Sequence, residues 1–253
     1  MAQFTKGDDP VGRDDFDAVV AVLQGESRWQ RFIVENIEMA QLGPADAKEL
    51  KFKDGTFKID KGSVNPDGTN DFKVDTRSLG LDDLPSDAAG VTDKLHSKII
   101  MKEWDGARRS YLLAVLHECV HLISDPASGG TRYSTAHSHL GGGLLEGLVE
   151  AITEDILVDQ KIPLPRDPGM IGHPQRVPIV RELMAQSDSS LWGWLLFRGN
   201  PRVVNDFIKS YSLAGWTRIK NMAVLNMTER AINEIRRLSK SPFASNLRTC
   251  GKY

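Results

Sequence analysis

Residues 107–124 read ARRSYLLAVLHECVHLIS, an apolar run that holds His117, Glu118 and His121 in the pattern H-E-x-x-H. Apolar residues recur at helical spacing here, which predicts a helix. Four residues turn a helix by about 400°, so the two imidazoles emerge on one face, roughly 6 Å apart along the axis. Two nitrogens placed in this way can bind one tetrahedral Zn²⁺. Glu118 lies about 100° round the helix, where it can take a proton from a water that the metal activates.

This pattern is weak evidence when taken alone. At this chain's own His and Glu frequencies it arises by chance in roughly one such chain in a hundred. The alternative is a buried amphipathic helix whose two histidines are satisfied by hydrogen bonds.

A second segment strengthens the metal hypothesis. Residues 144–155 read LLEGLVEAITED and place Glu146, Glu150 and Glu154 on one face of a predicted helix. Like charges at this spacing repel by a few tenths of a kcal/mol per pair, and a nearby cation removes that repulsion. A catalytic zinc site also needs a third protein ligand, which this face can supply. The alternative here is an exposed acidic stripe.

Together the two segments resemble the gluzincin clan of zinc metallopeptidases, the thermolysin-like group. The resemblance lies in His117-Glu118-x-x-His121, followed 29 residues later by Glu150 and then Glu154. It implies that His117, His121 and Glu150 bind Zn²⁺, that Glu118 is the general base, and that Glu154 holds a ligand histidine. The metzincin branch would instead continue as H-E-x-x-H-x-x-G-x-x-H, and residues 122–127 read LISDPA. The close match covers about 40 residues, and a looser one continues through residues 172–200.

Peptide hydrolysis also needs a donor that stabilises the oxyanion. In the clan this donor is usually His or Tyr, and the first candidate is His173, in a Pro- and Gly-rich loop where compact bacterial relatives often carry Tyr before the proline. Further candidates are Tyr133, His137, His139 and Tyr211. The first three of these lie in a Gly- and Ser-rich linker, which we expect to form a mobile lip over the cleft.

The pattern of apolar and turn-forming residues changes along the chain. Residues 14–41 favour two short helices interrupted at Gly25. Alternating segments and turn residues such as Asp54-Gly55 predict a small antiparallel sheet between about residues 50 and 102, including a strand at Lys98–Met101. By the clan's usual geometry that strand would pair with extended substrate. Residues 79–95 are expected to form a surface loop. His96 follows this loop directly.

From residue 107 to residue 240 the pattern is mainly helical. We therefore expect an α+β fold, zincin-like, in a single domain of residues 1–245 with a tail at 246–253. Helices are expected at residues 107–124, 144–160, 177–186, 191–197, 203–210 and 216–239.

Composition limits the function classes. The chain has 253 residues and a formal net charge of −2, so no global field favours nucleic acid or an anionic membrane. No stretch approaches 18 uninterrupted apolar residues, and the N-terminus lacks the features of a signal peptide. We expect cytoplasmic synthesis and a monomer, and export without a cleavable signal stays open.

The sequence therefore predicts a zinc-dependent endopeptidase that hydrolyses a protein or peptide substrate through a metal-activated water. Two alternatives remain at this stage. One is a metallopeptidase effector or toxin delivered by a secretion system. The other is a non-catalytic zinc-binding scaffold or interaction protein, against which an intact Glu118 argues.

Overall fold

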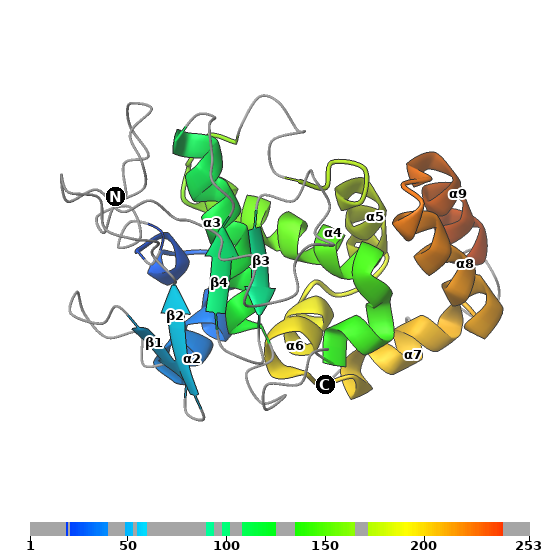
Figure 1. The fold of residues 1–253 in the computed structure, drawn as a ribbon. Coiled ribbons are helices and arrows are strands. Elements are labelled where there is room, and N and C mark those ends of the chain that lie inside the picture. The colour runs from blue at the N-terminus through cyan, green and yellow to red at the C-terminus, as the bar shows by residue number, and fades with distance from the viewer. Residues whose placement is uncertain are drawn as a thin grey trace.

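The computed structural model is built mainly of helices (Figure 1). The structure describes residue 19 and residues 21–39, 49–52, 55–59, 90–93, 98–101, 108–124, 135–164 and 172–239. Its early elements are α2 (Gln30–Met39), β1 (Glu49–Phe52), β2 (Gly55–Ile59), β3 (Gly90–Asp93), β4 (Lys98–Met101) and α3 (Arg108–Ile123). The later elements are α4 (Thr135–Asp159), α5 (Val177–Ala185), α6 (Ser190–Arg198), α7 (Arg202–Ser210), α8 (Leu213–Val224) and α9 (Thr228–Ser239).

The expected α+β fold with a small antiparallel sheet is wrong. Helices make up most of the described residues, and the short strands form a mixed sheet in the order β1-β2-β4-β3. Strands β2 and β4 run parallel, whereas the pairs β1–β2 and β3–β4 are antiparallel. Turn residues report only on strands that are neighbours in sequence, so they did not reveal the parallel pairing. The part of the expected sheet that would fall at residues 60–89 lies outside the described residues.

Two predictions about single strands also need correction. Strand β3 lies within residues 79–95, which were expected to form a loop. Four residues that begin with Gly90 and end with Asp93 are too few to show an alternating pattern. Strand β4 was expected to pair with substrate, but it lies inside the sheet, with β2 on one side and β3 on the other. Strand β3 is one of the two edge strands, β1 being the other, and β3 packs against α3 together with β4.

Helix α3 is buried around its circumference. All side chains from Leu113 to Val120 are buried, which is the pattern of a helix enclosed by other elements. It lies between the sheet on one side and α2 and α4 on the other (Figure 1). The motif H-E-x-x-H therefore sits inside the molecule, and the helix predicted at residues 107–124 is confirmed by α3.

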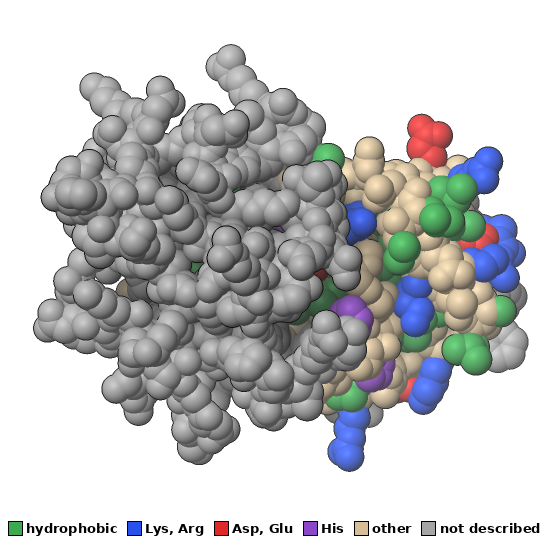
Figure 2. Space-filling model, viewed as in Figure 1, with side chains coloured by type: hydrophobic (Ala, Val, Ile, Leu, Met, Phe, Trp, Pro, Cys, Tyr) green, Lys and Arg blue, Asp and Glu red, His purple; other side chains and the backbone are tan. Residues whose placement is uncertain are grey.

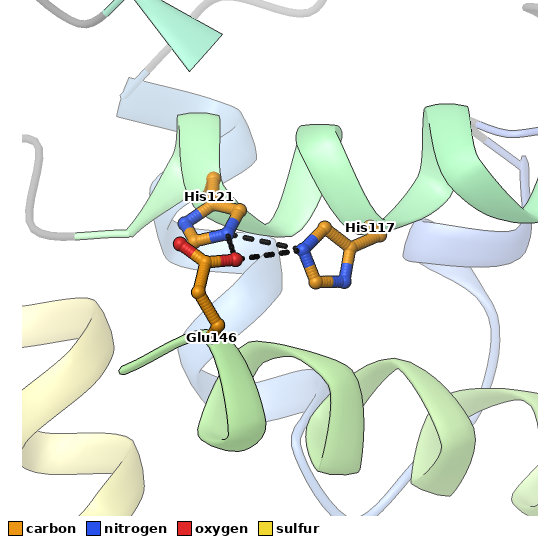
Figure 3. Close-up of side chains that lie close together, drawn as sticks. All are labelled: His117, His121 and Glu146. Carbon is orange, nitrogen blue, oxygen red and sulfur yellow. Dashed lines mark hydrogen bonds and ion pairs between the residues drawn. The ribbon is translucent and has the colours of Figure 1, made fainter. Parts of the chain in front are cut away.

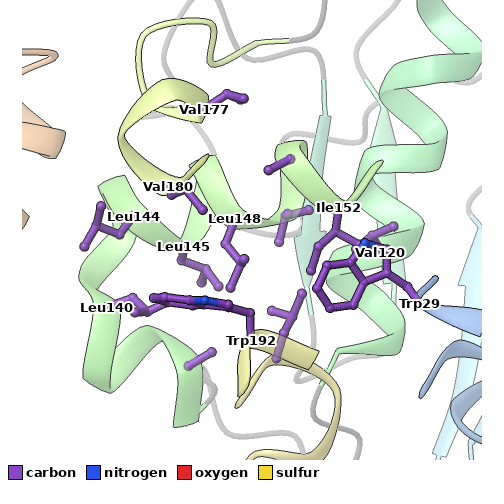
Figure 4. Packing of buried hydrophobic residues seen from close by; sticks show 14 of the residues in the cluster. Trp29, Val120, Leu140, Leu144, Leu145, Leu148, Ile152, Val177, Val180 and Trp192 are labelled. Carbon is purple, nitrogen blue, oxygen red and sulfur yellow. The ribbon is translucent and has the colours of Figure 1, made fainter. Parts of the chain in front are cut away.

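Helix α4 is the central element of the helical part. It is broken at Gly141, whose φ of 71° and ψ of 165° lie outside the helical region and suit a residue without Cβ. Its longer part buries Leu144, Leu148 and Ile152 against α3, α5, α6 and α8 (Figure 4). After this break the longer part of α4 runs along α3. The side of α4 that carries Glu146 and Glu150 therefore faces the side of α3 that carries the two histidines.

The remaining helices complete the core. Helices α5, α6 and α7 match their predicted ranges to within two residues. The single helix expected at residues 216–239 is instead two helices, because the chain turns between α8 and α9 at Asn226, where φ is 55°. Within the part of the chain that the structure describes, we find no helix with the length and hydropathy that a membrane crossing demands.

Candidate metal centre

The two histidines of the motif point at one another and at a carboxylate from α4 (Figure 3). The Nε2 atoms of His117 and His121 lie 3.1 Å apart. The Oε2 atom of Glu146 lies 3.0 Å from Nε2 of His121 and 3.4 Å from Nε2 of His117. Two rings one helical turn apart on α3 thus meet one side chain of α4, and three donor atoms converge on a single point.

These three distances fit a zinc ion. Ligands 2.0–2.1 Å from a tetrahedral Zn²⁺ are separated from one another by about 3.3–3.4 Å. The observed separations of 3.0–3.4 Å are close to that value. Two imidazoles and one carboxylate are also a donor set of catalytic zinc sites, in which a fourth position stays open.

Glu150 occupies the opposite side of His117. Its Oε2 atom lies 2.7 Å from Nδ1 of His117, and both side chains are almost fully buried. Within the described residues neither atom has a hydrogen-bond partner of normal geometry, so the two atoms meet as a close ion-pair contact. A carboxylate on the second nitrogen of a ligand histidine fixes the tautomer and the orientation of the ring. Glu150 was expected as the third ligand. The structure places it instead beside Nδ1 of His117, the position of a residue that would orient this histidine.

Glu154 was expected to hold a ligand histidine, and the structure places its carboxylate on Arg181 instead. Its Oε2 atom lies 3.2 Å from Nη2 of Arg181, on α5. Burial raises the pKa of Glu154, although the Arg181 guanidinium opposes this effect. The arrangement expected for Glu150 and Glu154 is thus found one helical turn earlier, at Glu146 and Glu150. Both pairs have the same spacing, so spacing alone could not choose between them.

The charges of the cluster are strongly coupled. Burial alone would lower the pKa of His117, but Glu146 and Glu150 outweigh it and raise that pKa well above the usual value. Burial would raise the pKa of Glu146, but the nearby histidines His121, His117 and His173 hold it well below its usual range. The two carboxylates therefore favour positive charge on the His117 ring, and at its Nε2 atom a proton and a metal ion would compete for the same lone pair.

Glu118, the expected general base, faces the sheet side of α3. Its side chain is nearly buried, and its Oε2 atom accepts a hydrogen bond of 2.7 Å from the hydroxyl of Thr92 on β3. The same hydroxyl lies 3.0 Å from the backbone carbonyl oxygen of Glu118. Sequence reasoning missed Thr92 because it had assigned residues 79–95 to a loop.

His173 lies beside the His117, His121 and Glu146 cluster. Its Nε2 atom is 3.3 Å from Oε2 of Glu146, and its ring centre is 6.0 Å from that of His117. Its Nδ1 atom lies 3.1 Å from Nη1 of Arg176. Arginine can only donate, so Nδ1 accepts and Nε2 carries the proton that faces the cluster. The side chain of Arg176 also donates to Asn226, which ties this loop to the turn between α8 and α9.

The other candidate donors are placed less favourably or lie outside the described residues. His137 and His139 lie in the first part of α4, so this part of the expected linker is helical. His137 is half-buried, and burial lowers its pKa while Glu146 opposes that effect. Tyr211 is buried in the aromatic core beside α8. Tyr133 and His96 lie outside the described residues. Histidine side chains do reach the surface on one face of the molecule (Figure 2).

Comparisons of the chain with protein-family models, with curated proteins and with solved structures found no match. The interpretation of the centre therefore depends on its own geometry and chemistry.

Proposed function

We propose that this chain is a zinc-dependent peptidase of the gluzincin type. One observation carries the proposal: Nε2 of His117, Nε2 of His121 and Oε2 of Glu146 converge at zinc-like separations. The general base expected for such a site, Glu118, is the residue next to His117. Glu146 and Glu150 also reproduce the pairing of a ligand carboxylate with a second carboxylate, four residues on, that holds a ligand histidine.

The residues divide the chemistry among them. His117, His121 and Glu146 would hold Zn²⁺, and Glu150 would orient His117. When bound, the ion supplies a Lewis acid that activates water and polarises the scissile carbonyl. Glu118 takes the proton of the attacking water on its carboxylate and passes it to the leaving amine. The Nε2–H group of His173 donates to the carbonyl oxygen as that oxygen gains negative charge.

The substrate in this proposal is a protein or peptide, and neither nucleic acid nor membrane is a partner. Synthesis in the cytoplasm is part of the proposal, and later delivery to another cell is compatible with the same chemistry. A non-catalytic zinc scaffold would keep the ligands and lack turnover, so the decisive test is turnover.

The test compares the zinc-loaded wild type with Glu118→Gln on a proteome-derived peptide library, with cleavage products identified by mass spectrometry. Wild type should generate new peptide termini, and Glu118→Gln should reduce their rate of formation by about 10²–10⁴-fold, because proton transfer is lost while zinc stays bound. The matched control is Glu229→Gln, at an exposed glutamate of α9, which should cleave like wild type. Zinc-loaded wild type that cleaves nothing would favour the scaffold, and an active Glu118→Gln would overturn the assigned base.

A further inference from the structure

Strand β3, at one edge of the sheet, supplies a hydroxyl to the carboxylate of Glu118. Oγ1 of Thr92 lies 2.7 Å from Oε2 of Glu118 and 3.0 Å from the Glu118 carbonyl oxygen. A threonine hydroxyl has one proton to donate. The shorter distance is that of a charge-assisted O–H···O⁻ bond, so this proton goes to the carboxylate.

This contact does more than fasten β3 to the helix. Glu118 lies in the interior of α3, where its carbonyl oxygen already faces the amide four residues on, so the helix needs no donor from the sheet. No other described residue hydrogen-bonds to the Glu118 carboxylate, so within the described part of the chain its orientation depends on Thr92. The same bond occupies Oε2, and Oε1 makes no hydrogen bond to any described residue.

We infer that Thr92 is a positioning residue, which holds Glu118 by Oε2 so that Oε1 can accept the proton of the reaction. This role rests on the proposed function. A glutamate without this anchor would sample several side-chain rotamers, and only some of them would present the carboxylate to the reacting water. The edge strand thereby becomes part of the catalytic apparatus through one hydroxyl.

A direct test that needs no substrate is the binding of acetohydroxamic acid to the zinc-loaded protein, measured by calorimetry. A hydroxamic acid loses its O–H proton when it binds a zinc ion, and in this site Glu118 would be the group that accepts it. Thr92→Val keeps the shape and the strand preference of threonine but has no donor. Thr92→Ser keeps the donor. The matched control is Thr153→Val, since Thr153 is a buried threonine whose hydroxyl donates to the carbonyl of Val149 within α4.

We expect Thr92→Val to weaken acetohydroxamate binding by about tenfold to a hundredfold, as for the loss of a hydrogen bond to a charged group. Glu118→Gln should weaken it at least as much. Zinc content should be that of wild type in every variant, and Thr92→Ser and Thr153→Val should keep the wild-type affinity. Equal affinity in Thr92→Val and wild type would overturn the role of Thr92. Failure of wild type to bind zinc, or of zinc-loaded wild type to bind the hydroxamate, would instead overturn the proposed function.

Discussion

At the scale of single residues, the site depends on which carboxylate faces which nitrogen of His117. Oε2 of Glu146 lies on the Nε2 side, whereas Oε2 of Glu150 lies 2.7 Å from Nδ1. We expect Glu150→Gln to bind zinc about 10–100-fold more weakly than wild type, because the ring loses the carboxylate that orients it and increases its basicity. Competition with a chromogenic chelator measures this affinity.

The control for this prediction is Glu154→Gln, one turn further along α4. Glu154 pairs with Arg181 and makes no contact with the two ligand histidines. The zinc affinity of Glu154→Gln should therefore equal that of wild type. If Glu154→Gln weakened zinc binding and Glu150→Gln did not, the carboxylate that holds the histidine would be Glu154, as the sequence alone had indicated.

Local geometry explains which of these residues could be predicted from the sequence. His117 and His121 lie on one helix, so their spacing fixes their relative positions. The choice among Glu146, Glu150 and Glu154 depends on how far α4 is displaced along α3, and packing between helices decides this. Thr92 and His173 reach the site from other elements, and only His173 carried a local signal, in its Pro- and Gly-rich loop.

At the scale of elements, the loop that carries His173 is held close to α4 at Gly147. A Cβ at this position would lie 2.9 Å from the carbonyl oxygen and 3.0 Å from the carbonyl carbon of Arg176. We expect Gly147→Ala to lower the free energy of unfolding by about 1–3 kcal/mol, as overpacking does, because backbone must move to admit the methyl group. Urea unfolding of the zinc-free protein measures this change.

Gly142 provides the matched control on the same helix. A Cβ there would meet only a ring carbon of His137 at 3.9 Å, an ordinary van der Waals contact. Gly142→Ala should therefore unfold at a urea concentration equal to or above that of wild type. Equal stability of Gly147→Ala and Gly142→Ala would show that the loop is not packed on α4 as the structure has it.

Ion pairs join α8 to α9 around Glu234. Its carboxylate lies 2.6 Å from Nη2 of Arg218 and 2.8 Å from Nε of Arg237, and these guanidiniums, Arg237 above all, lower its pKa to about 2. We expect Glu234→Gln to lower the free energy of unfolding at pH 7 by about 0.5–1 kcal/mol, since the pairs lie at the surface.

The pH dependence of this effect follows from linkage. A carboxyl whose pKa is lower in the folded state contributes its full stability above its unfolded pKa of about 4.3 and loses it as the pH falls toward the folded value. The difference between wild type and Glu234→Gln should thus be largest at pH 7 and narrow between about pH 4 and pH 3. A difference that stays constant over this range, in urea unfolding at each pH, would contradict the ion-pair account.

The helices were more predictable than the strands. Their apolar periodicity extends over more than two turns, and the ranges expected for α3, α5, α6 and α7 agree with the structure. The strands have four or five residues each, and their order in the sheet depends on contacts between distant segments. The helical segment of α4 that precedes the break at Gly141 was also missed, because its residues were assigned to a Gly- and Ser-rich linker.

At the scale of the whole molecule, the candidate site lies where four segments meet. Strand β3 supplies Thr92, α3 supplies the H-E-x-x-H motif, α4 supplies Glu146 and Glu150, and the segment before α5 supplies His173. Composition and charge predicted a globular chain with a buried core, but they carry no information on this assembly. It exists only once α4 has packed against α3 and the sheet has formed beside them.

The central claim is that His117, His121 and Glu146 together hold a zinc ion. Its most direct test is the zinc content of wild type and Glu146→Ala, purified without added metal and measured by elemental analysis, with circular dichroism to confirm that both are folded. We predict about one zinc per chain in wild type and a loss of most of it in Glu146→Ala, since two histidines alone form an incomplete site. A folded Glu146→Ala that retains the zinc of wild type, or a wild type that takes up none even when zinc is added, would contradict the account.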